Sequence, residues 1–133
     1  MTGPDMQTLL EEEELRFVPR VGRFDVDQVT ARIGTLGFAF RDAALPSMHV
    51  VAPTAAMRES LRARRLAHPE DGFPQVLLIQ VAPEEIHVAP ALDGALAGLS
   101  AEFIAWLAAT YPCQVFNEFG TDMSAALESA PEP

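Results

Sequence analysis

Three histidines are the first residues that could carry acid–base or metal chemistry. No pair among His49, His68 and His87 has the HxH or HxxxH spacing that brings two imidazoles to one zinc ion. His87 lies between Ile86 and Val88, and strand residues alternate between faces, so it should point away from these apolar neighbours. His49 has the same relation to its own neighbours. We therefore predict that both strand histidines face solvent, and we expect no metal site.

Cys113 and the segment NEFGTD are two further places where chemistry could occur. Cys113 lies in the uncharged, apolar stretch YPCQVF, without the positive neighbour that activates a thiol, and we predict a small core residue. Glu118 and Asp122 flank a glycine turn at a strand end, where two carboxylates could act in acid–base chemistry or bind a cation. Ordinary turn chemistry explains the same residues. Together with His87, they form a candidate polar site.

Two predicted helices carry candidate partner-binding residues. Arg58, Arg62 and Arg65 recur at i, i+4 and i+7, so they form a cationic stripe that could receive an acidic partner or phosphate, or pair with the protein's own carboxylates. Trp106 projects on the side of Glu102, from a helix that is apolar nearly all round. Such a helix is either buried on both sides or joined to another chain. We take these five residues as candidates for partner binding.

The charge balance and the missing motifs narrow the function classes. The net charge of −10 disfavours nucleic acid and anionic membranes and favours a basic protein partner. No stretch reaches the roughly 20 apolar residues that span a bilayer. The phosphate-binding patterns GxGxxG and GxxxxGK[ST] are absent, as are GxSxG, HExxH and CxxC, which lowers the expectation of an enzyme. We expect no cofactor. The lone cysteine and the acidic start MTGPDMQTLLEEEE favour a cytoplasmic location.

The apolar and turn patterns predict one α+β domain. Apolar residues make up 49% of the chain and charged residues 21%, which is typical of a packed globular protein. The order β-α-β-β-α-β-β-α-β predicts a single antiparallel or mixed sheet of about six strands with three helices packed against it. We divide the chain into an acidic N-terminal arm (1–14), one α+β domain (15–123) and a C-terminal tail (124–133). The predicted strands are 15–21, 38–41, 48–52, 75–81, 86–89 and 114–119, and the predicted helices are 26–36, 55–67 and 101–111.

Several details of these elements can be tested against the structure. Thr8 and Glu11 have capping-box spacing, but the arm is interpreted mainly as solvated. Pro19 lacks an N–H, so the first strand is expected at a sheet edge. Thr54 and Ser100 are predicted to begin the second and third helices, the latter after a flexible PALDGALAG loop. The small inward face predicted for the second helix is Ala56, Met57, Ser60, Ala63 and Ala67.

Three functions remain open on the sequence. The first is a non-catalytic protein-interaction module, such as an inhibitor, an immunity-type protein or an adaptor, whose acidic surface meets a basic partner. The second is a small enzyme or small-molecule binder with a pocket near the last strand. The third is a structural subunit that works as a homo-oligomer.

Overall fold

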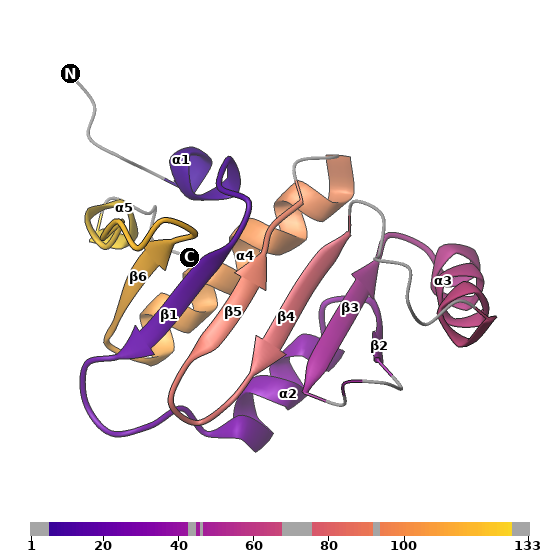
Figure 1. Cartoon of the computed structure of the whole chain (residues 1–133), viewed down its shortest axis with the longest axis horizontal. Helices are drawn as coiled ribbons and strands as arrows, with labels where there is room; N and C mark the ends of the chain where they lie inside the picture. Colours follow the sequence, from indigo (N-terminus) through magenta and orange to yellow (C-terminus); the bar gives the residue numbers. More distant parts are fainter. Residues whose placement is uncertain (1–5, 43–44, 46, 68–75, 92–93, 129–133) are drawn as a thin grey trace.

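The fold is built on one six-stranded antiparallel sheet, which confirms the predicted α+β class (Figure 1). The computed structural model describes residues 6–42, 45, 47–67, 76–91 and 94–128. The strand order is β2-β3-β4-β5-β1-β6, and every neighbouring pair is antiparallel. The strands are β1 Leu15–Pro19, β2 Phe38–Arg41, β3 Met48–Ala52, β4 Leu77–Val81, β5 Ile86–Ala89 and β6 Cys113–Asn117. The helices are α1 Met6–Leu10, α2 Val26–Gly34, α3 Ala55–Ala67, α4 Gly94–Thr110 and α5 Ala125–Glu128.

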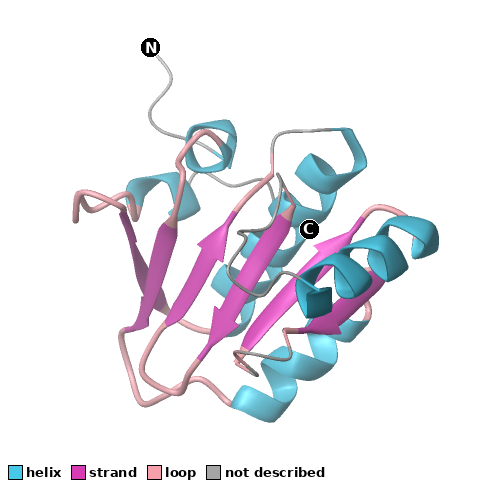
Figure 2. Cartoon of the chain, turned by 45° about the vertical axis from the view of Figure 1, so that its right-hand side comes forward, coloured by secondary structure: helices cyan, strands magenta, loops and turns pink. Residues whose placement is uncertain are grey.

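The helices divide between the two faces of the sheet (Figure 2). Helices α2 and α4 cover one face, where Ile33 and Phe103 join strand residues such as Phe17 in the main core. Helix α3 lies on the other face over β2 and β3, where a small second cluster contains Leu61 and Val50. In β4 the burial alternates along the strand, because successive side chains point to opposite faces. The two clusters are therefore separated by the sheet.

Strand β1 is interior, so its predicted place at the sheet edge is wrong. It pairs with β5 on one side and β6 on the other. Pro19 is tolerated because it is the last residue of the strand, and the pairing with β5 already stops at Phe17. The missing N–H of proline therefore removes no bond between β1 and β5.

The interpretation of the N-terminal segment as a solvated arm is wrong for residues 6–10. These residues form α1, and Leu9 is fully buried while Leu10 is 6% exposed. Because the helix begins at Met6, Thr8 lies inside it and not at its start. At the other end of the chain, α5 inserts the fully buried Ala126 into the same core. Both segments thus contribute apolar area to the main core.

Helix α3 presents a different face to the sheet from the predicted one. Its start is as expected, because the Thr54 hydroxyl oxygen accepts a hydrogen bond from the Met57 N–H at 3.1 Å. Leu61 is buried, however, whereas Met57 is 43% exposed and the neighbouring alanines are exposed. Burying Leu61 removes more apolar area from water than burying any one of these alanines, which favours the observed orientation.

Helix α4 begins seven residues earlier than predicted, at Gly94, and Ser100 lies within it. Ser100 is fully buried. Its hydroxyl donates to the Leu96 carbonyl at 2.7 Å and accepts from the Ala91 N–H at 3.2 Å. A serine whose hydroxyl bonds the preceding turn fits inside a helix as well as at its start. This is why the sequence signal for a cap was misleading.

Candidate functional site

One row of side chains crosses the sheet on the face opposite to α2 and α4. Paired positions run from β3 to β6 through Met48, Gln80, His87, Arg16 and Phe116. All five are partly exposed. Helix α3 covers β2 and β3 on this face, so the described helices leave the part of the row on β5, β1 and β6 accessible. We call these five residues the polar row.

His87 lies between two carboxylates at the middle of the polar row. Its Nδ1 is 2.7 Å from Oε1 of Glu14, and its Nε2 is 2.8 Å from Oε1 of Glu85. A carboxylate only accepts hydrogen bonds, so both contacts are satisfied when both ring nitrogens carry a proton. Burial lowers the pKa of His87, but the hydrogen bonds and charges of Glu85 and Glu14 outweigh it and raise the pKa above 6.5. The site therefore favours the imidazolium form.

Arg16 extends this network towards β6. Its Nη1 lies 3.5 Å from Oε2 of Glu85, and its Cζ lies 4.9 Å from the centroid of the Phe116 ring. The hydrogen bond from His87 is the main cause that lowers the pKa of Glu85, with a smaller effect from Arg16. The result is an alternating chain of charges whose members neutralise one another.

His49 is buried, so the prediction that it faces solvent is wrong. It is 5% exposed and pairs with Ile79, on the face covered by α2 and α4. Burial, helped by the nearby Arg41 charge, lowers its pKa below 6.5. The neutral imidazole is the form that fits this apolar environment. The two strand histidines thus lie on opposite faces of the sheet and favour opposite protonation states.

Glu118 and Asp122 are not among the described contacts of His87, so the predicted polar site of these three residues is not brought together. The Asn117 side chain accepts hydrogen bonds from the N–H groups of Phe119 and Thr121 at 3.0 and 2.9 Å. Asp122 accepts from the Ser124 N–H at 2.8 Å, and hydrogen bonds from Ser124 are the first cause that lowers its pKa. The segment therefore shows turn chemistry, while the described contacts of His87 are those to Glu14 and Glu85.

The same turn forms part of an acidic surface at one end of the sheet. Because Leu15 pairs with Asn117, the run 11–14 and the turn after β6 lie at the same end. Glu118 is exposed, and the Phe119 side chain beside it is 85% exposed. We call the residues Glu11 to Glu14, Glu118 and Phe119 the acidic end. The sequence indicated its charges, but only the strand register places them at the same end of the sheet as Phe119.

The arginine stripe on α3 is internally paired where the structure describes it. Glu59 Oε1 lies 3.2 Å from Arg58 Nε and 3.4 Å from Arg62 Nη1. Arg58 Cζ is also 5.8 Å from the centroid of the Phe38 ring. The side chain of Arg65 lies outside the described part. Pairing with a carboxylate of its own helix was one of the expected readings of this stripe.

Trp106 and Glu102 both contact α2 through Arg32. Arg32 Nη2 donates to Glu102 Oε1 at 3.2 Å, and Arg32 Cζ lies 5.6 Å from the centroid of the Trp106 ring. The indole also packs near Phe103 and Tyr111, with ring centroids 6.1 and 6.3 Å away. Trp106 is therefore partly buried, and its described contacts are with residues of α2, α4 and Tyr111 of the same chain.

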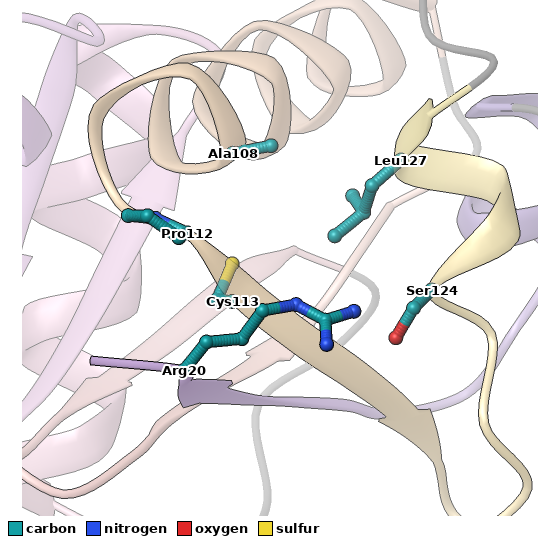
Figure 3. Close-up of a pocket in the computed structure, with 6 residues that line it drawn as sticks. All are labelled: Arg20, Ala108, Pro112, Cys113, Ser124 and Leu127. Carbon is teal, nitrogen blue, oxygen red and sulfur yellow. The ribbon is translucent and has the colours of Figure 1, made fainter.

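A cavity of about 180 Å³ lies beside the first residue of β6 (Figure 3). It is lined by Arg20, Ala108, Pro112, Cys113, Ser124 and Leu127. Figure 3 shows Cys113 and Leu127 pointing into the space and the Arg20 side chain crossing below it. Burial raises the pKa of the Cys113 thiol to about 11, against an opposing effect of the Arg20 charge. The thiol is therefore neutral, and the buried position of Cys113 is as predicted.

Sequence reasoning did not identify this cavity. Its lining comes from α4, β6, α5 and the residues next to β1, β6 and α5, and residues so far apart in the chain show no spacing signal. Among the described residues, no cluster of three His, Cys, Asp or Glu side chains could hold a metal ion.

Comparisons with known proteins found no relative of this chain. No family model matches the chain, and neither a curated protein nor a solved structure matches it significantly. Within the described residues, no helix has both the length and the apolar character required to cross a membrane. The fold and the site define the class as an α+β protein with a six-stranded antiparallel sheet.

Proposed function

We propose that this protein is a non-catalytic interaction module that binds a basic protein partner through its acidic end. The observation that carries the proposal is the exposure of Phe119, whose side chain is 85% accessible next to Glu118. An aromatic ring among carboxylates suits arginine or lysine side chains, because it offers a cation–π contact beside the ion pairs. A reducing compartment such as the cytoplasm is consistent with the free thiol of Cys113.

The charges of the acidic end should raise the rate of association with a basic partner as well as the affinity for it. The net charge of −10 attracts a basic protein over long distances, and the carboxylates near Phe119 orient it on arrival. Salt screens such steering, with a Debye length of about 10 Å at 0.1 M. The association rate with the partner should therefore fall as ionic strength rises, and a rate that ignores salt would contradict the proposal.

The direct test compares two variants with equal charge changes. Glu13→Gln/Glu118→Gln removes two charges from the acidic end, and Asp27→Asn/Glu84→Gln removes two exposed charges elsewhere. Tagged wild-type protein and both variants are incubated with an extract of the native host, and captured proteins are quantified by mass spectrometry. We expect a stoichiometric basic protein with the wild type and the control variant only. Equal capture by both variants, or no basic partner at all, would overturn the proposal.

Phe119→Ser provides a second arm of this experiment. The exposed ring contributes little to the core, so the variant should keep the wild-type melting temperature. Loss of the partner from Phe119→Ser with an unchanged fold supports a contact at the ring. Full capture would show that the aromatic ring has no part in binding.

A second candidate, the small-molecule binder with a pocket near the last strand, is favoured by the cavity at Cys113. Glu118, Asp122 and His87 are not among the residues that line it. If the protein binds a small molecule there, the residues that line the cavity must bind it, and not Glu118, Asp122 and His87.

A further inference from the structure

We propose that the cavity beside Cys113 binds a small organic carboxylate, with its charged group at Arg20 and its apolar tail towards α4 and α5. The cavity lies at the start of β6, whereas the acidic end follows the last residue of that strand. The proposal is therefore independent of partner binding at the acidic end, and it rests on the second candidate function, for which it names the ligand class.

The walls of the cavity define the tail of the ligand. Ala108, Pro112 and Leu127 supply apolar surface, and Cys113 adds a neutral, polarizable thiol. An engineered apolar cavity of about 150 Å³ takes up benzene, so a cavity of about 180 Å³ has room for a ligand of similar size. A short aliphatic acid such as butyrate has six non-hydrogen atoms and fits this limit.

The charge in the cavity defines the head group. Arg20 is exposed, and in the described part of the chain it has no ion-pair partner. Its positive charge lowers the pKa of both Cys113 and Asp122, so its field reaches the cavity and the loop beside it. Asp122 itself is held by the Ser124 N–H. A planar guanidinium in the lining of this cavity matches a carboxylate, which it binds through two parallel hydrogen bonds.

The test is a titration of the full chain with sodium butyrate, followed by the methyl NMR signals of Ala108 and Leu127. A ligand this small should bind with a Kd of about 1 mM or weaker. Butyramide has the same shape without the charge, and sodium chloride at matched concentration controls for ionic strength. We expect saturable shifts with butyrate only. Equal shifts with butyramide or with chloride would overturn the proposal.

Three variants locate the binding. Arg20→Gln should weaken butyrate binding at least about tenfold, because it removes the charge-assisted hydrogen bonds. Arg23→Gln is the matched control, since Arg23 is also exposed and lies outside the lining, and its Kd should equal that of the wild type. Ala108→Leu fills the cavity without changing charge and should abolish binding. Wild-type affinity in Arg20→Gln, or in a folded Ala108→Leu protein, would contradict a site inside the cavity.

Discussion

The Nδ1 atom of His87 lies 2.7 Å from Oε1 of Glu14 and so connects β5 to the residue that precedes β1. The two residues are far apart in the sequence, and the antiparallel register of β1 with β5 brings them together. With Glu85 on the other ring nitrogen, the imidazole holds its proton more firmly in the folded chain than in the unfolded one. This difference makes folding stability depend on pH.

His87 should make the protein less stable as the solution becomes alkaline. Its folded pKa is raised above 6.5, so its stabilising contribution is complete below pH 6.5 and is lost as the pH rises through the folded pKa. Melting temperatures measured from about pH 6 to about pH 9 should fall more steeply for the wild type than for His87→Gln, because Cys113, whose pKa is also raised, affects both proteins equally. Parallel curves for the two proteins would contradict this assignment.

His49 should have the opposite effect on the acid side. Its folded pKa is lowered by burial and by Arg41, so its contribution is complete above pH 6.5 and decreases as the pH falls towards the folded pKa. His49→Leu keeps an apolar group at the position and cannot be protonated. We expect that variant to lose less stability than the wild type between about pH 6.5 and pH 5, measured by urea unfolding at each pH.

Leu9→Ala should destabilise the protein, because α1 belongs to the core. The leucine is fully buried, and such truncations cost about 2–5 kcal/mol through lost burial and the cavity left behind. Val21→Ala is the control, since Val21 is 76% exposed and should change stability by less than about 0.5 kcal/mol. Chemical denaturation of both variants gives the comparison. A Leu9→Ala protein as stable as the wild type would instead support the interpretation of the N-terminal segment as a solvated arm.

Trp106→Ala should lower stability by about 2 kcal/mol or more, because the ring packs between α2 and α4. Ala109→Arg is its control, as Ala109 is exposed on the same helix. If α4 were an interface, Ala109→Arg would change the mass in solution without changing the melting temperature. If α4 only packs within the chain, the Ala109→Arg protein should keep the mass in solution and the melting temperature of the wild type.

Arg58→Gln/Arg62→Gln should change the free energy of unfolding by less than about 1 kcal/mol, because exposed ion pairs contribute little. The Arg62 and Glu59 side chains are 54% and 60% exposed. Urea denaturation in low and high salt provides the measurement. A larger loss would show that the Arg58 contact with Phe38 contributes more than the ion pairs do.

The sequence located most strands and their hairpins because these depend on local signals. Alternation and turn residues placed 38–41 next to 48–52, and 86–89 next to 75–81, and both pairs form in the sheet. The Thr54 cap and the buried Cys113 were also predicted correctly. The orientation of α3 was not, because the predicted face of small residues left out Leu61, the side chain that the structure buries against the sheet.

What the sequence determined by itself was the α+β class, the strands as local elements and the acidic charge, since these follow from residue types and their spacing. Tertiary structure alone decided which face His49 occupies, because alternation defines two faces but not which of them the helices cover. It also decided that Glu14 contacts His87 and that Arg20 and Leu127 line the same cavity. These arrangements depend on strand order and helix packing. Both bring together residues that are distant in the chain, and neither produces a periodic pattern in the sequence.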